Sequence, residues 1–502
     1  MVFFIDKAGS PYSIQAPEEF LSERALARRA KEQIVITEED IPISPNYTQG
    51  LIDLGIEVYY STKWMNGVLV QMDQNEAVVV QNLPYVTSIE KVAANAPLQQ
   101  RALKRAEPLP GQTNAAIDQQ RMLGIDLMHE YGLYGEGLLI GVFDDGFTNL
   151  SQLEAFRHIL EEDRLLYSFD FVNNRESVEN GEDHGTRVLS IIGANQFNYK
   201  GGVPNATFIL SATEAPQEYR VEEYNWLFAA EKADSAGVDI INTSLGYKTG
   251  FTDPSMNYTN AQLDGETAVI TRAANIAASK GIILVNSAGN SGSLVSAPAD
   301  SPNVLAVGAI AADSLIASFS SKGTSSNVFK PDVVAQGVST LLITSQGSMA
   351  AQNGTSFSAP MMTGLVAGVR QAYPGKTAAE IRDMIRAAGD RATNPDNVYG
   401  YGIPSFGRII ENERTLAAAN SVIYSAYPNP TADDLLLRFD EKYFGELLTI
   451  QIINPNGRLK NQFEFVPFES RNPLKLELNE SGIYFLRVIS NSGTTSRKII
   501  KY

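Results

Sequence analysis

A serine stands where a glycine-containing turn meets a helix-like apolar pattern. The run 353–360 contains Ser356, and apolar residues then recur at spacings of three and four up to Val369. This spacing predicts a buried helix with Ser356 at its mouth, where the unpaired N–H groups and the positive end of the dipole lie. Pro360 is expected near the end of the first turn. A serine so placed can attack a carbonyl carbon; the alternative is that it only caps the helix.

Two candidate polar residues follow apolar runs that predict buried strands. Asp144 comes directly after 137–143, and Asn290 comes shortly after 281–285. Strands that are apolar on both faces belong to parallel sheets, and functional residues in such sheets gather at the carboxyl ends of the strands. Each residue also fits a plain turn, because Asp and Asn beside glycine are common turn residues.

Histidine is scarce in this chain. The three histidines are His129, His158 and His184. The first two lie in helical patterns and are expected to pack or to face solvent. His184 is expected to open a helix, since it precedes the apolar run 189–193. It is therefore the candidate base, because neutral imidazole accepts a proton near neutral pH.

These segments resemble the subtilisin-like serine peptidases, the subtilases. The resemblance rests on the order aspartate, histidine, asparagine, serine and on the motifs Asp144-Asp145-Gly146, His184-Gly185-Thr186, Ser244-Leu245-Gly246 and Gly354-Thr355-Ser356. An α/β-hydrolase would show a different order and a Gly-x-Ser-x-Gly motif. Two positions depart from the family pattern: Asp145 replaces the usual Ser or Thr, and Gln336 replaces a frequent proline.

The resemblance implies a role for each candidate. Ser356 would be the nucleophile, His184 the general base and then the acid, and Asp144 the group that orients the imidazole. Asn290 and the Ser356 N–H would form the oxyanion hole. Ser244, Leu245 and Gly246 would bind the substrate main chain as an added strand. The polar loop 247–265 either shapes the cleft or is a plain insertion.

The expected fold of the central domain, 114–420, is α/β with a doubly wound, mostly parallel sheet of the subtilisin-like kind. A helix is expected at about 117–131 and another at about 221–236. Residues 1–95 alternate short strands with helices, including one at about 17–32, and indicate a small α/β domain. The resemblance implies that this domain is a propeptide that inhibits the enzyme and templates its folding. The run 96–113 is a proline-bearing, basic linker in which cleavage is expected.

Residues 425–502 change character to short β-rich runs with turn pairs such as Asn456-Gly457. They predict an antiparallel β-sandwich. The Tyr427-Pro428-Asn429-Pro430 start and the run 482–488 resemble the C-terminal sorting domain of the bacterial type IX secretion system. That resemblance implies export through the periplasm to the cell surface or medium, with the secretion machinery as a partner. No signal peptide is visible, so an exported protein's leader would have been removed from this sequence.

Composition limits the partners. The chain has 502 residues, a net charge of −17 and no cysteine. The charge argues against nucleic acid and anionic membrane surfaces as partners. Without cysteine there are no disulfides and no thiolate chemistry, and no apolar run has membrane-spanning length. The resemblance allows for structural calcium, but no run has clear ligand spacing, so no metal residues are assigned.

The sequence thus predicts a secreted serine endopeptidase acting on peptides or proteins. Three alternatives remain open. One is a catalytically silent subtilase fold that serves as a surface or adhesion protein. The second is an esterase, which the motif order disfavours. The third treats residues 1–95 as a binding module that does not inhibit the central domain.

Overall fold

The computed structural model describes residues 1–93, 115–420, 424–432, 434–439, 441–469, 472–478, 480–491 and 493–502. Its contacts divide the chain into two units, Met1–Ile409 and Ile410–Tyr502. The predicted linker 96–113 lies outside the described residues. The predicted domain boundaries therefore stay predictions.

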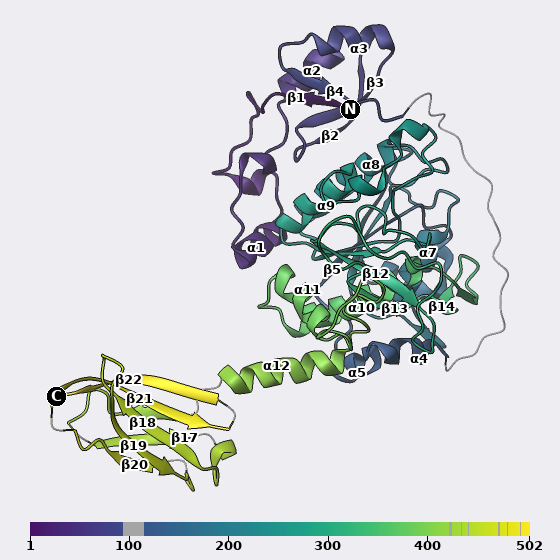
Figure 1. The fold of residues 1–502 in the computed structure, drawn as a ribbon. Coiled ribbons are helices and arrows are strands. Elements are labelled where there is room, and N and C mark those ends of the chain that lie inside the picture. The colour runs from purple at the N-terminus through teal and green to yellow at the C-terminus, as the bar shows by residue number, and fades with distance from the viewer. Residues whose placement is uncertain are drawn as a thin grey trace. The chain divides into compact units, whose positions relative to one another are not determined.

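A parallel sheet of seven strands forms the centre of the first unit. Val, Ile and Leu dominate most of these strands, and nearly every residue is buried except in the edge strand β6, because helices cover both faces. The prediction of a doubly wound α/β fold is confirmed (Figure 1). The strand order across the sheet is β13 (Val333–Gln336), β12 (Val304–Ile310), β11 (Ile283–Ser287), β10 (Ile240–Thr243), β5 (Leu139–Asp144), β9 (Thr207–Ala212) and β6 (Leu165–Asp170).

Helix α10 (Thr355–Ala372) is the most deeply buried helix of this layer, since every residue from Thr355 to Arg370 is buried. It packs on four strands of the sheet and against α7 and α11. One close approach explains a glycine: a Cβ on Gly364 would meet the Gly202 Cα at 3.0 Å. The remaining helices of this region are α4 (Ala115–Met122), α5 (Ile125–Glu130), α6 (Arg157–Glu161), α7 (His184–Gly193), α8 (Val221–Ala236), α9 (Val269–Ser279) and α11 (Ala378–Ala387). Helix α12 (Phe406–Asn420) begins in this unit and continues into the second one.

Two small hairpins and several short 3-10 turns complete the central region. The hairpins are β7 (Asn195–Gln196) with β8 (Tyr199–Lys200), and β14 (Thr340–Ile343) with β15 (Met349–Gln352). The second hairpin leads directly into the turn before α10. The loop after Ser244 contains two 3-10 turns, Pro254–Met256 and Asn260–Gln262.

The N-terminal region, residues 1–93, has its own antiparallel sheet and its own apolar core. The sheet order is β2 (Glu57–Thr62), β3 (Gly67–Gln71), β1 (Val2–Phe4) and β4 (Val86–Ile89), and the helices are α1 (Glu23–Glu32), α2 (Pro45–Ile52) and α3 (Gln74–Gln81). Tyr60 of this sheet packs on Phe228 of α8, with ring centroids 5.1 Å apart. The sheet therefore rests on a helix of the central region (Figure 1).

The C-terminal unit is an antiparallel β-sandwich, as predicted. Buried and exposed residues alternate in its strands, and the buried ones form a separate core that includes Leu437, Ile450 and Leu486. One sheet holds β16 (Tyr424–Tyr427), β17 (Asp434–Phe439) and β20 (Asn472–Lys475). The other holds β19 (Leu459–Phe465), β18 (Leu448–Ile453), β21 (Gly482–Ser490) and β22 (Gly493–Lys501).

Two helices differ from their predicted form. The single helix expected at 117–131 is two helices, because Gly124 adopts a left-handed conformation with φ of 69° between them. The helix expected at 17–32 begins only at Glu23, because the Ser22 side chain accepts the Ala25 N–H and caps it there. Apolar periodicity continues across both breaks, so the pattern alone does not reveal them.

Candidate active site

Asp144 and His184 form the first pair of the candidate site. Asp144 is the last residue of β5, and His184 is the first residue of α7. The His184 Nδ1 lies 2.6 Å from the Asp144 Oδ1. An ionised carboxylate only accepts hydrogen bonds, so in the neutral imidazole Nδ1 carries the proton and Nε2 has a free lone pair. The pair thus presents a proton acceptor on the far side of the ring.

The glycine after His184 allows this pair to form. A Cβ on Gly185 would lie 2.6 Å from the Gly146 carbonyl oxygen and 3.0 Å from the Asp144 Cβ. Any larger residue would therefore push the start of α7 away from the turn that follows β5. The Gly185 N–H also points toward the Asp145 Oδ1, at 3.3 Å.

A third titratable group lies beside the pair. The Asp145 N–H donates to the Asp144 Oδ1 at 2.9 Å, and the Asp145 carboxylate lies near the imidazole. Burial and the neighbouring Asp144 raise the pKa of Asp145 to about 8. Burial opposes a charge on His184, but the charge and hydrogen bond of Asp144, with the charge of Asp145, outweigh it and raise the pKa of His184 to about 9.

Ser356 occupies the first turn of α10. Gly354 precedes the helix with φ of 151°, a conformation that favours glycine. The Ser356 hydroxyl donates to the Ser244 carbonyl at 3.2 Å. His184 lies close by, since its ring centroid is 5.6 Å from that of Phe357, the next residue of the helix. A turn about the Ser356 Cα–Cβ bond would redirect the hydroxyl.

Pro360 lies in the second turn of α10, so its expected place near the end of the first turn is wrong. Proline has no N–H, so it cannot donate to the carbonyl four residues earlier, which belongs to Ser356. The Ser244 hydroxyl donates to that carbonyl instead, at 3.0 Å. Ser244 and Ser356 are therefore joined by two hydrogen bonds in opposite directions.

Asn290 is oriented by Thr355. Its Oδ1 accepts hydrogen bonds from both the N–H and the hydroxyl of Thr355, each at 2.9 Å. With the amide oxygen held there, the Asn290 NH₂ group is directed away from the helix and remains a donor. Thr355 is a site residue that the sequence reasoning missed, although it stands beside Ser356 in the motif.

A pocket of about 230 Å³ opens beside Ser356. The predicted substrate-binding residues Ser244, Leu245 and Gly246 all line it, as do Asn290 and Lys248 at the start of the predicted loop. The rest of the lining is mainly serine and glycine, and Lys248 is the charged residue among the lining residues described. The pocket is therefore polar, with one positive charge near its rim.

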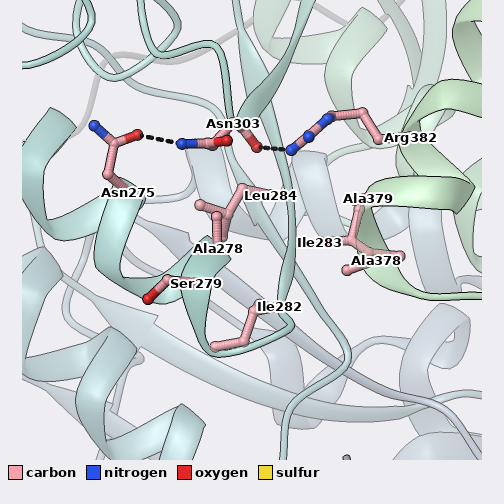
Figure 2. Close-up of a pocket in the computed structure, with 10 residues that line it drawn as sticks. All are labelled: Asn275, Ala278, Ser279, Ile282, Ile283, Leu284, Asn303, Ala378, Ala379 and Arg382. Carbon is pink, nitrogen blue, oxygen red and sulfur yellow. Dashed lines mark hydrogen bonds between the residues drawn. The ribbon is translucent and has the colours of Figure 1, made fainter. Parts of the chain in front are cut away.

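A second pocket, of about 170 Å³, lies elsewhere (Figure 2). It lies between the end of α9, the start of β11 and the start of α11. Asn303 joins its two sides, since it donates to Asn275 at 3.0 Å and accepts from Arg382 at 2.8 Å (Figure 2). The lining includes no carboxylate or imidazole, so it offers no nucleophile–base pair.

The other two histidines pack against backbone. His129 Nε2 lies 2.8 Å from the Gly202 carbonyl, and His158 Nε2 lies 3.0 Å from the Pro204 carbonyl. Burial lowers the pKa of both. Neither belongs to the candidate site.

One group of the described His, Asp and Glu residues has the spacing to hold a metal ion: Asp144, Asp145 and His184. Calcium takes six to eight oxygen ligands. Two carboxylates and an imidazole do not match that requirement, so this group is not the calcium site that the resemblance allows.

The fold is a doubly wound α/β sheet, with Asp144 at the end of a central strand and His184 and Ser356 in the first turns of two helices that cover the sheet. Residues 135–402 match the model of the subtilase family. The match covers more than half of the chain, and the chain belongs to the subtilase family.

Relatives and solved structures agree with this. Subtilisin E of Bacillus subtilis is 30% identical over 284 residues, which are 55% of this chain and 65% of the relative. Subtilisin Savinase of Lederbergia lenta is 28% identical over 55% of this chain and 91% of the relative. The chain thus spans less than two thirds of the first of these. The epidermin leader peptide processing serine protease of Staphylococcus aureus shares the fold, with a TM-score of 0.56 and 16% identity over 73% of this chain and 96% of that one.

The flanking regions match other family models. Residues 1–108 match the peptidase S8 propeptide domain of Bacteroidota, and residues 425–502 match a secretion system C-terminal sorting domain. The latter indicates secretion or attachment to the cell surface. Within the residues that the structure covers, no helix is both long and apolar enough to cross a membrane.

Proposed function

We propose that the chain is a secreted serine endopeptidase that cleaves peptide bonds through an acyl-enzyme intermediate. The observation that carries the proposal is the 2.6 Å bond between His184 Nδ1 and Asp144, which leaves Nε2 as a base at the mouth of the helix that bears Ser356. Subtilisins among its relatives support the same chemistry.

In the proposed reaction, Ser356 attacks the substrate carbonyl and passes its proton to His184 Nε2. Asp144 holds the imidazole in this tautomer and stabilises its cation. The Asn290 amide and the Ser356 N–H donate to the oxyanion. His184 then protonates the leaving amine, and water attacks the acyl group by the same route in reverse.

Binding of the substrate is assigned to the segment that follows β10. The peptide would pair with Ser244, Leu245 and Gly246 as an added strand, which selects extended chains. A side chain next to the scissile bond would enter the 230 Å³ pocket. The Ser244 hydroxyl donates to the Ser356 carbonyl, so the segment that binds the substrate is fixed relative to the nucleophile.

The flanking regions are assigned regulatory and transport roles. We infer that the N-terminal region inhibits the enzyme until the linker is cut. Its chain leaves β4 and bonds to the start of α8, where the Val221 N–H donates to the Val92 carbonyl at 3.1 Å. The C-terminal sandwich would target the protein, once it is in the periplasm, to the type IX secretion machinery.

A fluorophosphonate probe tests the catalytic proposal. The probe should label the processed enzyme on Ser356, as identified by mass spectrometry, and Ser356→Ala should abolish both labelling and peptide hydrolysis. Ser358→Ala, two residues along the same helix, is the matched control and should label normally. A well-folded native protein that neither labels nor cleaves a peptide library would instead be the catalytically silent binding protein.

A further inference from the structure

Asp234, near the end of α8, is a buried carboxylate of the central region. Its positively charged partners are side chains of the N-terminal region. It accepts from Arg29 at 2.8 and 3.0 Å and also pairs with Arg28, and Lys63 Nζ lies 3.8 Å away. The Asp234 side chain is fully buried, and both arginines are nearly so. A buried charge needs such partners. The N-terminal region therefore supplies the cations that stabilise the buried Asp234 carboxylate.

Backbone carbonyls of the central region also accept hydrogen bonds from the arginines of α1. Arg24 donates to the carbonyls of Gly137 at 2.8 Å and Gly237 at 3.0 Å, and it also pairs with Asp239. Arg28 donates to the carbonyl of Lys280 at 3.1 Å and to that of Val238. Several of these carbonyls lie at the C-terminal ends of α8 and α9, where the helix dipole favours cations.

We call this set the arginine site. It consists of Asp234, Asp239 and the carbonyls of Gly137, Gly237, Val238 and Lys280. All its groups accept hydrogen bonds, and a planar guanidinium with several donors fits such a set better than an ammonium does. Arg24 and Arg28 stand four positions apart and share one face of α1. Arg29 follows directly and also bonds to Asp234.

Contacts of opposite sign lie beside the arginine site. Lys280 of the central region pairs with Glu39 and Asp40. Glu32, at the end of α1, accepts the Ala378 N–H at 2.9 and 3.0 Å, at the start of α11. A Cβ on Gly281 would meet the Glu32 side chain at 2.7 Å, so the two surfaces fit closely.

The arginine site lies at the amino ends of the central strands, whereas the candidate active site lies at their carboxyl ends. Strand β10 enters the sheet just after Val238 and Asp239 and leaves it at Thr243, beside Ser244. In Figure 1, α1 lies away from the sheet of its own region, close to α9 and α11. Contacts of α1 therefore do not pass through the substrate cleft.

We propose that the arginine site is an exosite that keeps the N-terminal region bound after the linker is cut. Cleavage frees the chain at the cleft, but α1 stays bound at the amino ends of the strands. The cut propeptide therefore remains an inhibitor until it is removed or degraded. The proposal rests on the proposed function only for the natural cut in the linker.

The test replaces that natural cut. In the full chain with Ser356→Ala, a recognition sequence for a site-specific protease is inserted after Arg105, and an affinity tag follows Tyr502. After cleavage the protein is bound to resin, and release of the N-terminal fragment is followed over time. Because the chain's own activity is not used, failure of the proposed function does not affect this result.

Three variants are compared with the unchanged α1. Arg28→Ala removes the guanidinium, and Arg28→Lys keeps the charge but loses the fork that bonds several acceptors. Loss of charge-assisted hydrogen bonds should speed release about 10- to 100-fold for Arg28→Ala and about tenfold for Arg28→Lys. Glu23→Gln, an exposed change on the same helix, is the matched control and should release at the unchanged rate.

The outcome is decided by the variants that fold. If Arg28→Ala does not give soluble protein, Arg28→Lys and the more exposed Arg24→Ala carry the comparison. Release at the control rate by folded Arg28 variants would overturn the proposal, and so would complete release of the unchanged fragment on cutting. Slow release that depends on Arg28, with no peptidase activity in the native chain, would keep the exosite and reject the proposed enzyme.

Discussion

Replacing Asp145 by asparagine should move the pH profile of the enzyme toward acid. Only neutral imidazole can take the serine proton, so activity is present above the pKa of His184 and is lost below it. An ordinary histidine would place the midpoint at about pH 6–7.5. Because the neighbouring carboxylates raise the pKa of His184 to about 9, the free enzyme should have an alkaline midpoint.

The size of the shift follows from the separation of the charges. A carboxylate oxygen of Asp144, a carboxylate oxygen of Asp145 and a ring nitrogen of His184 all lie within 4.8 Å of one another. At effective dielectric constants of roughly 20–40, two unit charges at that distance interact by about 2–3 kcal/mol. His184 keeps 30% side-chain exposure, and Asp145 is itself partly protonated near its pKa of about 8. The net effect should therefore be about one pH unit.

The measurement is kcat/KM against pH for a peptide substrate. Asp145→Asn should move the midpoint from near 9 to about 8, with little change at the alkaline plateau. The asparagine oxygen can still accept the Gly185 N–H, so the turn should be kept. Asp313→Asn, an exposed change far along the chain, is the control and should leave the profile as it is. An unchanged or more alkaline midpoint for Asp145→Asn would refute the reasoning.

Three more predictions concern other parts of the molecule. Asn290→Ala should lower kcat about 10²–10³-fold with a lesser change in KM, a magnitude established on a subtilisin rather than derived from this structure; a change confined to KM would count against the oxyanion role. Lys248→Glu should reverse a preference for acidic over basic side chains in the polar pocket, as seen in the cleavage of matched peptides. A chain ending at Asn420 should hydrolyse peptides at the full rate but collect in the periplasm of the native bacterium, as measured by activity assay and cell fractionation. Lost activity would make the sandwich part of the catalyst, and normal export would reject the sorting role.

Local patterns predicted much of the architecture. Helix α8 was expected at 221–236 and has those bounds, and His184 begins α7 as its neighbours indicated. These succeed because apolar periodicity and a following buried run fix both elements locally. The fold class and family are confirmed, whereas the catalytic roles and the domain boundaries stay predictions.

Long-range contacts could not be predicted in this way. The pairing of Arg28 with Asp234 joins residues 206 positions apart, and nothing near either residue indicates its partner. The bond between Thr355 and Asn290 spans 65 positions. The break at Gly124 could not be predicted either, because a single glycine inside a periodic pattern fits one continuous helix as well as two separate ones.

Two hydrogen bonds join Ser244 and Ser356. Through them, the amino acid at position 360 affects how the loop at Ser244 is held, although the two positions lie more than a hundred residues apart. With any residue other than proline there, α10 would supply its own donor to the Ser356 carbonyl, and the Ser244 hydroxyl would compete with it. Positions 244 and 360 should therefore change together rather than singly as related sequences diverge. A Pro360→Ala chain should tolerate Ser244→Ala better than the native chain does, which a double-mutant cycle on peptide hydrolysis would measure.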